Sequence, residues 1–194
     1  MTALIIGLVI FLGIHSVSIV NRPWRDGIAA RIGDRLWRGL YSLVAILGFA
    51  LMILGYGQAR HASTMLYAPP SWSRDVSLLL MLPVFPLLLA AYLPGRIQRA
   101  VKHPMLLAVL IWAVAHLLSN GSPADVVLFG AFLIWAAADL VSAARRAQRP
   151  SVHAPPAKRN DAIAVVAGLA VYAVFVLGGH AWLIGVPATN WAHF

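Results

Sequence analysis

Residues 104–144 read PMLLAVLIWAVAHLLSNGSPADVVLFGAFLIWAAADLVSAA, which is two long apolar runs separated by a short polar segment. Gly121 suits the C-terminal cap of a helix that begins at Pro104. Ser122 and Asp125 match the capping-box pattern at the start of a second helix. The stretch therefore predicts two successive apolar helices, over residues 104–119 and 123–144.

Apolar stretches of this kind recur along the chain. It has 194 residues, of which 61% are hydrophobic and 11% charged. A soluble domain of this length cannot bury so much apolar surface, and most of the stretches approach the roughly 20 residues that a membrane-spanning helix needs. The sequence predicts an all-α polytopic membrane bundle of about six transmembrane helices, in a single domain over residues 1–194. The stretches are 3–20, 40–57, 76–93, 104–119, 123–144 and 162–184.

Two of the expected helices depart from a regular span. Residues 76–93 contain Pro83 and Pro86, so this helix should be kinked or locally opened. The helix over 104–119 has room for only about 16 residues, roughly 24 Å, which is short of a hydrocarbon core of roughly 30 Å. We therefore expect it to be shielded inside the bundle rather than to face lipid.

The fifteen Lys and Arg residues are distributed unevenly between the connections. Only Arg60 and Arg74 lie in one set of connections, and the other thirteen lie in the opposite set. Because cytoplasmic loops carry an excess of Lys and Arg, the basic set is expected in the cytoplasm and both termini in the periplasm of a bacterial inner membrane. The net charge of +9 thus reflects topology and does not indicate nucleic-acid binding. The basic set is Arg22, Arg25, Arg31, Arg35, Arg38, Arg96, Arg99, Lys102, Arg145, Arg146, Arg149, Lys158 and Arg159.

Two of the basic connections differ in character. Residues 145–160, RRAQRPSVHAPPAKRN, are rich in Pro and Arg and have no apolar period, which predicts a flexible cytoplasmic linker with a solvated His153. Residues 21–39 interleave Arg with apolar side chains. This pattern predicts an interfacial amphipathic helix attracted to anionic lipid, with Trp24 and Trp37 at the level of the headgroups.

Residue types that are absent exclude several kinds of chemistry. The chain contains no cysteine, which excludes disulfides, thiolate nucleophiles and Cys-ligated zinc or iron–sulfur sites. It also contains no glutamate, which excludes HExxH metalloprotease chemistry, and its six aspartates are too scattered to indicate a carboxylate pair.

Four histidines lie in or beside the expected helices: His15, His103, His116 and His180. Ionisable residues at membrane depth are candidates for function, and the alternative for each is a neutral imidazole that bonds a backbone carbonyl or a serine. A capping or headgroup role is sufficient for His103, which directly precedes Pro104 at the cytoplasmic boundary. Separate histidines without acidic or thiolate partners favour haem over zinc if a cofactor is bound, because zinc usually needs three or four ligands and haem only one or two.

Seven short motifs run in order through nearly the whole chain: FLGIHS (11–16), GLYSLV (39–44), GYGQAR (55–60), AVKHPM (100–105), LIWAVAHLLSNG (110–121), LFGAFLIWAAAD (128–139) and HAWLIGV (180–186). These motifs resemble those of the NnrU family of integral membrane proteins. The Trp-x-x-x-His, His-Ser and His-Pro elements are also similar to those of the 15-cis-ζ-carotene isomerases, remote relatives that bind haem b through two histidines.

Carried onto this chain, the resemblance implies His15 and His116 as the axial ligands of haem b, with Trp112 in the haem-binding motif. Depth in the membrane favours another pairing. His15 lies roughly 18 Å along the first helix, whereas His116 is one turn from the outer end of its own helix, so by depth His180 is the better partner for His116. The isomerases have a cysteine three residues before the second ligand, where this chain has Ala113, which argues against ligand switching and carotene isomerisation.

The resemblance implies a haem b-binding redox or accessory factor linked to nitrite and nitric oxide metabolism in denitrification. Its expected partners are the lipid bilayer, haem and proteins of nitrogen-oxide metabolism. Two histidine ligands leave the iron six-coordinate, which suits electron transfer or sensing better than open-site catalysis. Two alternatives stay open: a haem-dependent cis–trans isomerase of a carotenoid or other polyene lipid, and a cofactor-free membrane assembly or transport factor.

Overall fold

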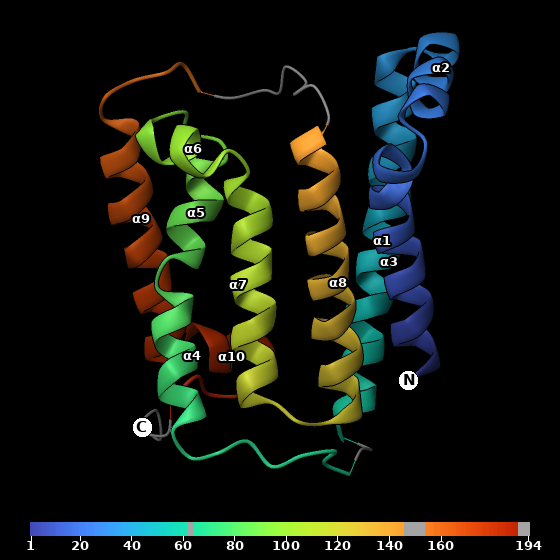
Figure 1. Cartoon of the computed structure of the whole chain (residues 1–194). Helices are drawn as coiled ribbons and strands as arrows, with labels where there is room; N and C mark the ends of the chain where they lie inside the picture. The colour runs from blue at the N-terminus through green and yellow to red at the C-terminus, as the bar shows by residue number, and fades with distance from the viewer. Residues whose placement is uncertain (62–63, 146–153, 190–194) are drawn as a thin grey trace. The chain divides into compact units, whose positions relative to one another are not determined.

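The computed structural model describes residues 1–61, 64–145 and 154–189, and every regular element in these ranges is helical (Figure 1). His153, Arg146 and Arg149 lie outside the described residues, as does half of the expected linker. The all-α prediction is confirmed. The elements are α1 (Thr2–Val20), α2 (Arg22–Ile32), α3 (Asp34–His61), α4 (Ser73–Met81), α5 (Val84–Ala90), α6 (Arg96–Val101), α7 (Pro104–Ser119), α8 (Pro123–Arg145), α9 (Asn160–Val174), the π-helical turn η1 (Phe175–Gly179) and α10 (His180–Ile184).

The lengths and composition of these helices show a multi-pass membrane protein. Within the described ranges, five helical segments are long and apolar enough to cross a bilayer, and large apolar side chains such as Val9, Leu43 and Ile134 are exposed. Water would make so much exposed apolar surface unfavourable, whereas lipid does not. The five segments are Thr2–Val20, Asp34–His61, Ser73–Ala90, Pro123–Arg145 and Asn160–Ile184.

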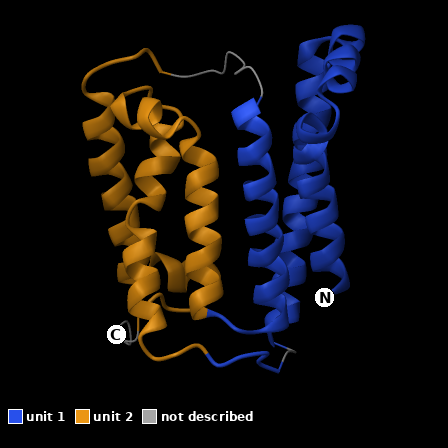
Figure 2. Cartoon of the chain, viewed as in Figure 1, with its two compact units in different colours: residues 1–68, 120–146 blue, residues 69–119, 147–194 orange. Residues whose placement is uncertain are grey.

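The chain folds into two compact units, which Figure 2 colours separately. Unit 1 comprises residues 1–68 and 120–146, and unit 2 comprises residues 69–119 and 147–194. Unit 1 therefore contains α1, α2, α3 and α8, and unit 2 contains the remaining helices. The chain passes from unit 1 to unit 2, back to unit 1 and again to unit 2.

In unit 1, glycines bring α1 and α3 into direct backbone contact. A Cβ atom at Gly7 would collide with the backbone of Met52, and one at Gly55 would collide with the backbone of Leu4. Gly48 faces the backbone of Phe11 in the same way. Small residues at such crossings allow the close packing that holds helices together where no hydrophobic effect operates between them.

The start of α8 forms the predicted capping box. The backbone N–H of Ser122 donates to Oδ2 of Asp125 at 3.0 Å, and the N–H of Asp125 donates to Oγ of Ser122 at 3.2 Å. The hydroxyl of Tyr56 on α3 donates to the other carboxylate oxygen of Asp125 at 2.6 Å. One buried aspartate thus both caps α8 and fastens it to α3.

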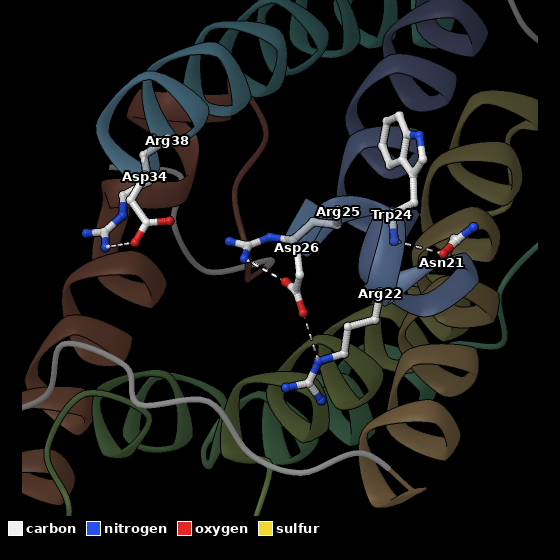
Figure 3. A network of polar contacts seen from close by, with 7 residues as sticks. All are labelled: Asn21, Arg22, Trp24, Arg25, Asp26, Asp34 and Arg38. Atoms are coloured by element: carbon white, nitrogen blue, oxygen red, sulfur yellow. Dashed lines mark hydrogen bonds and ion pairs between the residues drawn. The ribbon is translucent and has the colours of Figure 1, made fainter. Parts of the chain in front are cut away.

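The basic segment after α1 differs from the prediction of one amphipathic helix over residues 21–39. Helix α2 ends at Ile32, because Gly33 adopts a φ of 87°, and α3 begins at Asp34. In Figure 3 the Asn21 side chain accepts from the N–H of Trp24 at 3.0 Å and so caps α2. Trp37 consequently belongs to α3, where it is buried with the Arg25 guanidinium 5.6 Å from its ring centre.

Ion pairs along α2 and the start of α3 balance part of this positive charge (Figure 3). Asp26 accepts from Arg25 at 3.0 Å and lies 3.8 Å from Nε of Arg22. Arg38 lies 3.8 Å from Asp34. These side chains are partly or largely exposed, so each pair contributes at most about 1 kcal/mol to stability.

In unit 2, the expected distortion of the third apolar stretch is confirmed. The helix is interrupted between Met81 and Val84, so that α4 and α5 are separate, with Pro83 in the break. A backbone N–H is missing at each proline, and the ring clashes with the preceding turn. Gly168 of α9 packs against the backbone of Pro86. The second proline therefore lies in the contact between α5 and α9.

Helix α7 has the boundaries predicted from Pro104 and Gly121, and its 16 residues fall below the length of the five spans. Within unit 2 it packs beside α4 and α5 (Figure 1), with Ala108 against Val84 and Leu87. It therefore lies alongside the longer α4–α5 segment. Shielding of its remaining surface stays a prediction.

Candidate functional site

His116 lies in the last turn of α7, and its orientation is fixed by its own helix. Nδ1 lies 2.8 Å from the carbonyl oxygen of Trp112, one turn earlier. This contact assigns the ring proton to Nδ1 and the lone pair to Nε2. The Trp112 and His116 ring centres are 5.2 Å apart, so the indole packs beside the imidazole.

Two serines of α4 and α7 hold the backbone around His116. The hydroxyl of Ser77 donates to the carbonyl oxygen of Ala115 at 2.6 Å, and the hydroxyl of Ser119 donates to Oγ of Ser77 at 2.6 Å. Ser77 is buried, as are Ala113 and Ala115. The Ser77 contact fixes the residue that directly precedes the histidine. Sequence reasoning missed it, because a serine in an apolar helix does not reveal which neighbouring helix it faces.

His180 is placed by an irregular stretch of chain. It is the first residue of α10, directly after the kinked segment Phe175–Gly179, within which Gly178 has the non-helical φ of 153°. Helix α10 ends at Gly185, which is left-handed with φ 77°. The chain then turns back, and Nδ1 of His180 lies 2.5 Å from the carbonyl oxygen of Val186.

The His116 and His180 rings meet within unit 2. Their centres are 6.4 Å apart and their planes are inclined by 31°. Ring centres of aromatic side chains in contact lie roughly 4.5–7 Å apart. The two imidazoles are therefore direct neighbours within unit 2.

His15 lies in unit 1, so its pairing with His116 stays a prediction. Its Nδ1 is 2.7 Å from the carbonyl oxygen of Phe11, one turn earlier on α1. Phe11, Tyr41 and Trp135 surround the ring, with centres 4.3, 5.3 and 6.0 Å away. Nε1 of Trp135 is buried without a hydrogen-bond acceptor in the part of the chain that the structure describes.

His103 directly precedes α7, as the sequence predicts. Its carbonyl oxygen accepts from the N–H of Leu107 at 3.1 Å, which is the first intrahelical hydrogen bond of α7. This backbone position is that of a helix cap. The boundary role of the His103 side chain stays a prediction.

The described residues provide a pair of neighbouring imidazoles, and haem is a group that needs only one or two such ligands. Among the described residues, no three His, Asp or Glu side chains gather in a way that could hold a metal ion. What the structure provides is a pair of imidazoles on separate apolar helices, each with Nδ1 at a carbonyl oxygen. A carbonyl partner of this kind fixes the tautomer that presents Nε2 to a metal.

Comparison with known proteins identifies one family. The family described as NnrU protein matches residues 3–188, which is nearly the whole chain. No curated protein and no solved structure matches it. The relation to the carotene isomerases therefore stays a resemblance of motifs.

Proposed function

This chain belongs to the NnrU family, and we propose that it is a haem b-binding protein of the bacterial inner membrane. In this proposal it serves as a redox or accessory factor linked to nitrite and nitric oxide metabolism. The observation that carries the proposal is the imidazole of His116, held by the Trp112 carbonyl, with a second imidazole 6.4 Å away. Haem, when bound, would supply one-electron chemistry.

The chain's own residues would bind and orient the haem. The imidazole of His116 would hold the haem iron, and the Ser77 hydroxyl fixes the carbonyl of the residue before it. The resemblance to the carotene isomerases implies His15 as the second ligand of the haem, whereas the closeness of the His180 ring to that of His116 favours His180. A haem held by two imidazoles would supply electron transfer or sensing rather than turnover of a bound substrate.

The proposed orientation places both termini in the periplasm. Thirteen of fifteen basic residues lie in one set of connections, and this set faces the cytoplasm by the positive-inside rule. The His116 end of α7 is then on the periplasmic side, because Lys102 and His103 precede the other end of this helix. The proposed haem site lies toward the periplasmic face.

The test is the absorption spectrum of the protein purified in detergent from haem-replete cells. We expect a Soret band and, on reduction, the sharp α and β bands of low-spin, six-coordinate haem b. The His116→Ala variant should become high-spin or lose the haem, because one axial ligand is missing. A colourless, folded wild-type protein would contradict the proposal and favour the cofactor-free assembly or transport factor.

No described feature favours isomerisation of a polyene lipid over this redox role. Ala113 occupies the position of the isomerase cysteine and is fully buried. An alternative iron ligand at this place is therefore missing. Conversion of a cis-carotenoid by the purified haem protein would be the result that favours the isomerase alternative.

A further inference from the structure

The backbone before His180 departs from a regular helix in a way that redirects this side chain. Helix α9 runs regularly to Val174, and the segment Phe175–Gly179 that follows it is kinked at Gly178. The kink separates α9 from α10 and changes the direction of the helix axis before His180. Gly178 adds a φ of 153°, which residues with a side chain rarely adopt. The direction of His180 therefore depends on this irregularity.

The chain after His180 turns back to hold the ring. Gly185 takes a left-handed conformation with φ 77°, and Val186 then presents its carbonyl oxygen to Nδ1 of His180 at 2.5 Å. This partner lies six residues after the histidine, whereas a regular helix offers only a carbonyl one turn earlier. Such a bond fixes the ring and its tautomer, as the outer contacts of metal-ligating histidines do.

His15 has a different environment, which aromatic side chains form. Its ring centre is 4.3 Å from that of Phe11, and Tyr41 and Trp135 complete the surroundings. Its carbonyl partner is the ordinary one, a single turn earlier on the same helix. No backbone irregularity of the described chain lies next to it, since α1 is regular from Thr2 to Val20.

We propose that His180, and not His15, is the second ligand of the haem, and that Gly178 and Val186 are its positioning residues. This inference rests on the proposed function, because it concerns the ligands of the same site. Both proposed ligands belong to unit 2. His116 lies on α7 and His180 on α10, and their ring centres are 6.4 Å apart.

The ligand assignment is tested by single substitutions in the full-length protein purified with haem. The readouts are the absorption spectrum and the electron paramagnetic resonance spectrum of the ferric form. His180→Ala should convert low-spin haem to a high-spin signal, and free imidazole added to the buffer should restore the low-spin signal. His15→Ala should retain the low-spin spectrum of the wild type.

The positioning role is tested by a pair of glycine substitutions. An added Cβ meets no atom within 4 Å at either Gly178 or Gly13, but only Gly178 has a positive φ. Gly178→Ala should therefore strain the backbone before His180 and produce a mixture of high-spin and low-spin haem. Gly13→Ala, two residues before His15, should leave the spectrum unchanged.

The possible outcomes separate this inference from the proposed function. A wild-type protein without haem contradicts the proposed function itself. A wild-type protein with low-spin haem that His15→Ala makes high-spin, while His180→Ala has no effect, contradicts only the inference and restores the pairing of His15 with His116. If His180→Ala does not fold, imidazole-sensitive high-spin haem in Gly178→Ala supports the assignment, and an unchanged low-spin spectrum there contradicts it.

Discussion

The substitution Gly55→Ala should separate α1 from α3 and destabilise unit 1. The new Cβ would collide with the backbone nitrogen and Cα of Leu4. Backbone atoms cannot move aside as a flexible side chain does, so the helices must shift. Overpacking of this kind typically costs about 1–3 kcal/mol, against a gain of about 0.5–1 kcal/mol from replacing a helical glycine by alanine.

Gly57→Ala is the matched control, because Gly57 lies in the same helix and its added Cβ meets no atom within 4 Å. Both variants gain the same helix propensity, so the difference in their free energies of unfolding isolates the helix contact. We expect Gly55→Ala to be less stable than Gly57→Ala by about 1–3 kcal/mol in a denaturant titration in detergent, followed by far-ultraviolet circular dichroism. Equal stability of the two variants would refute the backbone contact between α1 and α3.

Three further substitutions or fusions test other parts of the structure. Tyr56→Phe removes the donor to Asp125 and should lower the free energy of unfolding by about 1–3 kcal/mol, whereas Tyr92→Phe, at an exposed ring, should leave it unchanged. His103→Ala should retain the haem spectrum and at most reduce the yield, and loss of haem with the fold intact would make His103 a ligand. A phosphatase that is active only in the periplasm should be active when fused after Phe194, and a cytoplasmic reporter there should be silent.

The parts of the fold that were predictable from the sequence are those set by local backbone chemistry. The capping box of Ser122 and Asp125, the limits of α7 and the break at Pro83 each depend on a few neighbouring residues. The break at Gly33 is equally local, but the apolar and basic pattern continues through it and so predicts one amphipathic helix. The positive φ of Gly33 interrupts the helix, and a second helix begins at Asp34.

The contacts between helices were not predictable in the same way. Gly7, Gly48 and Gly55 are three small residues in apolar helices, and only the crossing of α1 over α3 shows that all three serve one contact. The role of Gly178 was not predictable either. Gly178 in fact supplies a backbone conformation, since an added Cβ there would meet no atom within 4 Å.

The histidines show why a carbonyl partner alone does not separate a structural imidazole from a ligand. His15, His116 and His180 each hold Nδ1 at a backbone carbonyl oxygen, which is what a neutral buried histidine and a metal-ligating histidine both require. Two further features differ between His180 and His15: a second imidazole beside the ring, and an irregular backbone that directs the ring. His180 has both, because His116 lies 6.4 Å away and the bond to Val186 depends on the turn at Gly185. His15 has neither within unit 1, where aromatic side chains occupy its surroundings. The depth argument from the sequence and the ring contact within unit 2 both favour His180 as the partner of His116, and the spectra of His180→Ala and His15→Ala test this pairing against that of His15 with His116.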